Sequence, residues 1–199
     1  MSTAKGHSSA ALYYATRDGQ SRRIAEHVSR RLGEQQTFAP AQDIAVAQPL
    51  PSDLAAASVV VLIAAVRYGR HLPEADRFLA IYRSLPSAPP LALASVNLTA
   101  RKPAKTTVAG NVYLRKVIAR HRLAPAVAVA FAGRLDYGRY RWFDRQIIRF
   151  IMLLTRGPTN TDACIEYTSW QAVDDFAARV VELTRRAGPS KPSEISRSR

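Results

Sequence analysis

The chain has 199 residues, enough to bury a full hydrophobic core in one domain without disulfides or metal ions. Its 29 Lys and Arg residues against 15 Asp and Glu residues give a formal net charge of +14. This excess favours anionic partners such as nucleic acid, phospholipid or carboxylate ligands. The one cysteine, Cys164, excludes an internal disulfide framework and a cysteine-based zinc site, and it fits a reducing compartment.

The sequence contains no apolar run with the length of a membrane span or of a signal-peptide core. The longest apolar runs, 59–66 and 123–131, are well short of the ~20 residues that cross a bilayer. We therefore expect a protein that is cytoplasmic or attached to a membrane surface. One domain is predicted at 9–186, between a flexible N-terminus at 1–8 and a disordered basic tail at 187–199 that is rich in Pro, Ser, Lys and Arg.

Short apolar runs alternate with helical patterns in the first part of the chain, as in parallel βαβ units. The first strand is predicted at 10–15. A helix follows at 21–33, where Ile24, Val28 and Leu32 recur every four residues and Gly33 ends the pattern. A second, less distinct strand is placed within 37–46. The β-branched run 59–65 has no polar alternation, which is typical of a central strand covered on both faces.

The second half of the chain continues this alternation. A helix is predicted after Pro73, a strand at 91–96, a helix around 114–121 and a last central strand at 125–132. The final helix is expected to begin at Thr168 or Ser169, because Thr168 and Gln171 have the spacing of a capping box, and to stop at Gly188.

These elements predict an α/β, flavodoxin-like fold. Its five-stranded parallel sheet has the order 2-1-3-4-5, with helices on both faces and ligands at the carboxyl ends of the first and third strands. One segment exceeds this plan, because 134–167 is far longer than the ~2 to 6 residues usual between a strand and a helix. We therefore expect a long insertion before the last helix.

The loop after the first strand has the composition of a phosphate site. Thr16 and Ser21 supply hydroxyls, Gly19 permits close approach to the backbone, and the following helix offers free amides. The hexapeptide is neither a Walker loop nor a Gly-x-Gly-x-x-Gly motif, which favours a monophosphate over a pyrophosphate. The alternative is an ordinary turn in which Ser21 caps the helix.

The loops after the third and fourth predicted strands should lie at the same edge of the sheet and could hold a flat ring between them. Tyr68 can stack on such a ring, and backbone amides around Asn97 can meet a polar heterocycle edge. Without a ligand, Tyr68 would be a partly exposed aromatic residue of a loop, and His71 would be a surface histidine whose hydrogen bonds are satisfied. We regard His71 as a weak acid or base candidate.

Within the insertion, basic and apolar residues separate at helical spacing. On a helix, Arg141, Arg145, Arg149 and Arg156 fall within roughly 80°, with Phe143, Ile147, Phe150 and Leu154 opposite. This pattern describes a membrane-surface helix or one that meets a large apolar ligand. A helix packed on its own domain is the alternative. Aromatic and arginine residues here could also bind nucleic acid, but the apolar run 147–154 has no use in a phosphate groove.

Four strings give the chain a family resemblance from about Ser9 to Leu183. They are Ala15-Thr16-Arg17-Asp18-Gly19-Gln20-Ser21, Arg67-Tyr68-Gly69, Ser95-Val96-Asn97-Leu98 with Ala100-Arg101-Lys102-Pro103, and Tyr140-Arg141-Trp142 with Asp144-Arg145. These strings resemble the flavodoxin-like, quinone-dependent protoporphyrinogen oxidases of bacteria. The resemblance implies one non-covalent FMN, oxidation of protoporphyrinogen IX to protoporphyrin IX in haem biosynthesis, and electron transfer to menaquinone or ubiquinone at the cytoplasmic membrane.

The resemblance also implies which residues form the sites. Those expected to hold FMN are Thr16, Arg17, Asp18, Gly19, Gln20 and Ser21 at the phosphate, Val66, Arg67, Tyr68, Gly69, Ser95, Val96, Asn97, Leu98 and Thr99 beside the ring, and Arg134, Leu135, Asp136 and Tyr137 closing the site. Two of these positions depart from the family, because Arg134 replaces a small residue and Asp136 a basic one. The substrate's propionates and ring are assigned to Arg139, Arg141, Trp142 and Arg145.

Two other functions are compatible with this fold. A flavodoxin that carries electrons between proteins usually has an acidic surface and a shorter chain, both unlike this sequence. An NAD(P)H:quinone reductase would differ in its electron donor. We expect a peripheral protein on the cytoplasmic side of an anionic membrane that does not bind nucleic acid, with a homo-oligomer as an alternative to a monomer.

Overall fold

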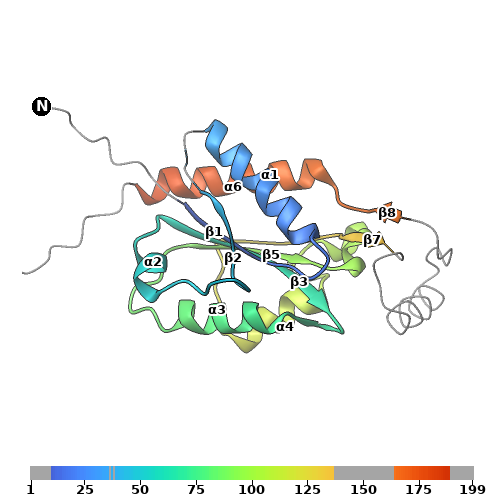
Figure 1. Ribbon diagram of the computed structural model, residues 1–199, viewed down its shortest axis with the longest axis horizontal. Coiled ribbons are helices and arrows are strands. Elements are labelled where there is room, and N and C mark those ends of the chain that lie inside the picture. Colours follow the sequence, from blue (N-terminus) through green and yellow to red (C-terminus); the bar gives the residue numbers. More distant parts are fainter. Residues whose placement is uncertain (1–9, 36, 38, 137–163, 189–199) are drawn as a thin grey trace, which may run out of the picture.

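A parallel sheet forms the centre of the computed structural model, which describes residues 10–35, 37, 39–136 and 164–188 (Figure 1). Its strands are β1 (Ala10–Ala15), β2 (Ala41–Asp43), β3 (Val59–Arg67), β5 (Leu91–Val96) and β6 (Val127–Phe131), in the order β2-β1-β3-β5-β6. All neighbours in this order pair in parallel. The short β4 (Arg70–His71) pairs antiparallel with the end of β3 and lies off this path. The predicted flavodoxin-like order of five parallel strands is therefore confirmed.

Helices cover both faces of the sheet, as Figure 1 shows. α1 (Gln20–Glu34) and α6 (Trp170–Ala187) lie on one face. α2 (Pro51–Ala55), α3 (Pro73–Arg83) and α4 (Val112–Arg120) lie on the other. Side chains alternate across each strand, so Leu12 joins the first core and Tyr13 the second. β3 is buried on both faces from Val59 to Ala64, as its unbroken apolar sequence predicted.

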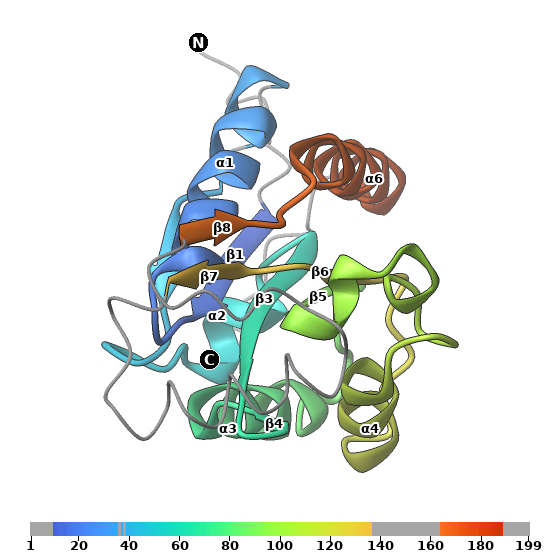
Figure 2. The same ribbon diagram turned by 90° about the vertical axis from the view of Figure 1, so that its right-hand side faces the viewer.

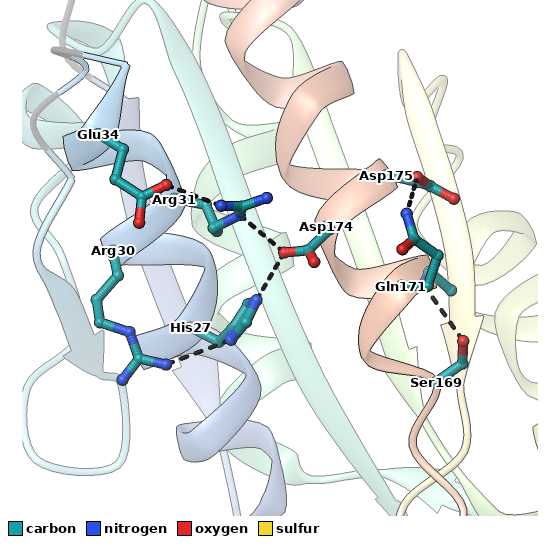
Figure 3. Close-up of polar contacts among 9 residues, drawn as sticks. His27, Arg30, Arg31, Glu34, Ser169, Gln171, Asp174 and Asp175 are labelled. Carbon is teal, nitrogen blue, oxygen red and sulfur yellow. Dashed lines mark hydrogen bonds and ion pairs between the residues drawn. The ribbon is translucent and has the colours of Figure 1, made fainter.

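The seam between α1 and α6 combines an apolar stripe with polar contacts at its rim. Ile24, Val28 and Leu32 are fully buried, as their spacing predicted. At the rim, Asp174 Oδ1 lies 2.7 Å from His27 Nε2 and 2.8 Å from Arg31 Nε (Figure 3). The hydrogen bond from His27, followed by the charge of Arg31, lowers the pKa of the Asp174 carboxyl. These contacts fix α6 on α1.

Three local features differ from the sequence-based expectations. The second strand is only Ala41–Asp43, because Pro40 precedes it and it forms the partly exposed edge of the sheet. The short helix α2 was not predicted. The last helix is capped by Ser169, whose Oγ accepts a hydrogen bond from the amide of Ala172 at 3.3 Å. The capping box predicted for Thr168 and Gln171 is wrong, since the Thr168 hydroxyl is bonded inside the fold.

The ends of the predicted insertion form a small antiparallel pair. β7 (Arg134–Asp136) and β8 (Cys164–Glu166) pair beside the carboxyl ends of the central strands (Figure 2). The amphipathic helix predicted from the stripe of Arg141, Arg145, Arg149 and Arg156 lies outside the described residues, as do the N-terminus at 1–8 and nearly all of the tail. Within the described residues, no helix is both long and apolar enough to cross a membrane.

Candidate functional site

The loops that follow β1, β3, β5 and β6 meet at one edge of the sheet, which Figure 2 views end-on. Parallel strands place their carboxyl ends at the same edge, and ligands of open α/β sheets bind there. The edge brings together the predicted segments 16–21, 66–69, 95–99 and the start of the insertion at 134–136. The sequence-based grouping of these loops is therefore confirmed.

Gly19 creates the turn that starts α1. It is the N-cap residue with a φ of 88°, a left-handed conformation that residues with a Cβ rarely adopt. The Thr16 hydroxyl accepts a hydrogen bond from the Gly19 amide at 3.0 Å, which leaves the hydroxyl proton available for donation. The first amides of α1 have no carbonyl acceptor within the helix. This loop therefore presents donors where a helix dipole favours negative charge.

Ser21 provides the most direct sign that this loop holds a ligand. Ser21 is 1% exposed, and its Oγ has no hydrogen-bond partner among the residues that the structure describes. A buried polar group left unsatisfied costs about 1–3 kcal/mol. An anion at the start of α1 would supply the missing acceptor, so the residues present fit a phosphate group.

An ion pair joins the loop after β1 to the loop after β3. Arg67 NH1 lies 2.9 Å from Oδ2 and 3.2 Å from Oδ1 of Asp18. The pair offsets the negative charge that Asp18 places beside the phosphate loop. The Arg67 guanidinium also lies 5.2 Å from the ring centroid of Tyr68. Tyr68 has a φ of 49° and is 68% exposed, so its ring lies at the rim of this edge.

A buried network of amides and hydroxyls supports the loop after β5. Asn111 caps α4, and its Oδ1 accepts from the amides of Tyr113 and Leu114, so its Nδ2 must face the other way. That Nδ2 donates to Asn97 Oδ1 at 3.1 Å. Asn97 Nδ2 in turn donates to Ser95 Oγ at 3.0 Å. The orientation of each amide is therefore set by the backbone of α4, and sequence reasoning missed the role of Asn111.

His71 closes this network from the side of β4. Its Nε2 lies 2.9 Å from Ser95 Oγ, which accepts a hydrogen bond from Asn97. Among the described contacts of Ser95 Oγ only the imidazole can accept the hydroxyl proton, so we assign Ser95 as the donor. This assignment places the proton of the neutral ring on Nδ1. Burial is the main cause that lowers the pKa of His71 to about 4, against the opposing charge of Asp76. The expected surface histidine is wrong, because only 6% of His71 is exposed.

The remaining predicted site residues divide into two groups. Arg134 is partly buried in β7, where Leu135 and Asp136 continue the strand. Those outside the described residues are Tyr137, Arg139, Arg141, Trp142 and Arg145. No group of three or more His, Cys, Asp or Glu side chains within the described ranges could hold a metal ion.

The sequence is similar to a known domain family and to proteins from two organisms. Residues 11–162 match the flavodoxin domain family. The chain is 36% identical over 176 residues to protoporphyrinogen IX dehydrogenase [quinone] from Escherichia coli strain K12, covering 87% of this chain and 94% of that protein. The corresponding protein from Leishmania major is 36% identical over 194 residues, covering 94% of this chain and 84% of that protein.

Solved structures support the fold. A rubredoxin oxygen:oxidoreductase from Desulfovibrio gigas superimposes with a TM-score of 0.56 at 11% identity, over 92% of this chain and 37% of that longer chain. A flavodoxin from the domain Archaea superimposes with a TM-score of 0.52 at 11% identity, over 89% of this chain and 99% of that chain. At this identity, both structures support the architecture alone.

The family match agrees with the geometry of the carboxyl edge, where α1 begins and the buried hydroxyl of Ser21 lies in its first turn. It implies that the domain binds a flavin. The chain belongs to the flavodoxin domain family and, within it, to the quinone-dependent protoporphyrinogen IX dehydrogenases.

Proposed function

We propose that this protein oxidises protoporphyrinogen IX to protoporphyrin IX in haem biosynthesis, with FMN as cofactor and menaquinone or ubiquinone as electron acceptor. The observation that carries the proposal is 36% identity to a protoporphyrinogen IX dehydrogenase [quinone] over 94% of that protein's length. The shared region is long enough to include the whole sheet and the segment before α6.

The choice of FMN rests on the phosphate loop. FMN ends in a monophosphate, whereas FAD contains a pyrophosphate that needs a longer glycine-rich cradle. Thr16 and Ser21 would donate to the phosphate oxygens together with the first amides of α1. Arg67 would offset the nearby charge of Asp18. Tyr68 and the backbone of 95–99 would border the ring, and Arg134, Leu135, Asp136 and Tyr137 would close the site.

The reaction removes six electrons and six protons from the porphyrinogen, which is equivalent to six hydrogen atoms. Three quinone molecules accept them and leave as three quinols, so the overall reaction balances without oxygen. A flavin, if held by the residues named above, would supply the two-electron redox chemistry between the porphyrinogen and the quinone. The described part of the chain contributes binding and orientation, and neutral His71 keeps the Ser95–Asn97 network intact rather than adding charge beside the ring.

Charge at the rim supports the choice of substrate and of membrane. Exposed cations follow β1, β3 and β5 at the carboxyl edge: Arg17, Arg70, Lys102 and Lys105. Such a rim attracts the two propionates of protoporphyrinogen and the anionic headgroups of a membrane. Arg139, Arg141, Trp142 and Arg145 would extend this surface and bind the substrate. A peripheral position on the cytoplasmic face of the membrane would give the site access to quinone in the bilayer.

The test begins with an absorbance spectrum of the purified protein and of protein incubated with FMN. Anaerobic assays then follow porphyrin fluorescence after addition of protoporphyrinogen and a quinone. We expect flavin bands and quinone-dependent formation of porphyrin, with heat-denatured protein as the control. Bleaching of the flavin by NADPH but not by porphyrinogen would contradict the proposal in favour of an NAD(P)H:quinone reductase. Protein that cannot be loaded with any flavin would refute the cofactor assignment.

A further inference from the structure

Gln20 lies in the phosphate loop, but its side chain is used elsewhere. It is the first residue of α1 and is 7% exposed. Its Nε2 donates to Thr168 Oγ1 at 2.8 Å and to Glu166 Oε1 at 3.1 Å. Its Oε1 accepts from Arg23 NH1 at 3.1 Å. The oxygen of the carboxamide therefore bonds within α1, and its nitrogen bonds to the segment that leads into α6.

Thr168 extends this contact to the sheet. Its hydroxyl accepts from Gln20 and donates to the carbonyl oxygen of Ala132 at 2.9 Å. Ala132 directly follows β6, so one buried hydroxyl joins the first turn of α1 to the carboxyl end of this edge strand of the sheet. Gln20 and Thr168 are 148 residues apart in the chain. Buried hydrogen bonds with both partners in place resist displacement, because breaking one leaves a polar group unsatisfied.

The charge of Glu166 is balanced at the same point. Arg23 NH1 lies 3.1 Å from Glu166 Oε2 as well as from Gln20 Oε1. The Arg23 guanidinium also lies 5.5 Å from the ring centroid of Trp170, at the start of α6. The carboxylate of Glu166 is thus paired with a cation of α1. This arrangement limits its repulsion of an anion at the helix N-terminus.

We infer that Gln20 and Thr168 are positioning residues for the phosphate half of the flavin site. They hold the first turn of α1 against β6 and the entry to α6, and this fixes the loop amides and Ser21 without a contact to the phosphate. Several donors must converge on one small anion, so a small displacement of the turn weakens them together. The ring is bordered by other loops and depends less on this turn. The inference rests on the proposed flavin cofactor.

A comparison of FMN with riboflavin isolates this effect, because riboflavin has the same ring but no phosphate. We would measure the dissociation constants of both by quenching of flavin fluorescence in the full-length apoprotein. The wild type should bind FMN more tightly than riboflavin. Gln20→Met and Thr168→Val should each weaken FMN binding by about tenfold, the effect of one lost charge-assisted hydrogen bond. Both should change riboflavin binding by less than about twofold.

Two controls separate positioning from a general loss of structure. Thr168→Ser retains the hydroxyl and should retain the wild-type ratio of the two dissociation constants. Gln171→Met makes the matched change at an exposed side chain whose Nε2 donates to Asp175 Oδ1 at 3.0 Å, and it should also leave the ratio unchanged. The double variant Gln20→Met with Thr168→Val should lose little more than either single change, because the two residues share one hydrogen bond.

The possible outcomes are distinct. Equal weakening of FMN and riboflavin, or no weakening of FMN, would overturn the inference while leaving the proposed function standing. If one variant fails to fold, the comparison of Thr168→Ser with the wild type and the remaining variant still decides the question. A folded wild type that binds neither flavin would overturn the cofactor assignment, and the inference with it.

Discussion

The stability of the protein should depend on pH through His71. The ring is buried between β4 and the end of β5, and Ser95 donates a hydrogen bond to its Nε2. Protonation would bury a charge and remove that acceptor, which is why the pKa of His71 falls from 6.5 to about 4. At pH values between 4 and 6.5, the imidazole of His71 is protonated in the unfolded chain and neutral in the folded protein. The contribution of neutral His71 to the free energy of unfolding should therefore be fully present above pH 6.5 and should decrease as the pH falls toward 4.

The size of this effect follows from the shift. One pKa unit corresponds to ~1.4 kcal/mol, so the whole shift corresponds to about 3 kcal/mol. About 2 kcal/mol of this should be lost between pH 7 and pH 5, where the unfolded imidazole is mostly protonated and the folded one is not. The charged neighbours are Asp76, Arg120 and His121, and Asp76 itself pairs with both of the others.

Urea denaturation at pH 7 and pH 5 measures the effect. His71→Gln keeps an acceptor for the Ser95 hydroxyl but does not titrate in this range, so its free energy of unfolding should lose about 2 kcal/mol less than the wild type between the two pH values. Taking this difference cancels the other titrating groups. Equal pH dependence in the two proteins would refute the assignment of a neutral buried histidine.

Three further changes test the site. Ser21→Ala removes an unsatisfied buried hydroxyl, so the apoprotein should gain about 1 kcal/mol of stability in thermal melts. The dissociation constant for FMN should rise about tenfold, because a donor to the phosphate is lost. A destabilised apoprotein would contradict this reasoning. Asn111→Ala removes the cap of α4 and the hydrogen bond to Asn97, so the free energy of unfolding should fall by about 1–3 kcal/mol in urea denaturation. A decrease below about 0.5 kcal/mol would show that the network contributes little to stability. Changing both Arg141 and Arg145 to Gln should raise the Michaelis constant for porphyrinogen and weaken binding to anionic vesicles in sedimentation; unchanged values for both would exclude the proposed substrate and membrane roles.

Local patterns in the sequence were enough to predict the order of the main elements and the edge of the sheet at which their loops meet. Unbroken β-branched runs such as that of β3 can only be central strands, and the four-residue recurrence of Ile24, Val28 and Leu32 defines the buried face of α1. Both signals are local, because they depend on the spacing of apolar side chains within one element. Parallel connectivity then brings the loops after β1, β3 and β5 to one edge.

Only the tertiary structure decided what the polar side chains at that edge do. Gln20 bonds to Thr168, 148 residues away, and Asn111 orients Asn97 across a turn between different elements. His71 becomes a buried neutral ring because β4 folds back against β3 and brings it to Ser95. No spacing in the sequence encodes these contacts, since they arise where distant segments cross after folding. For the same reason the orphaned hydroxyl of Ser21, which most directly indicates a bound phosphate, could be recognised only once its surroundings were known.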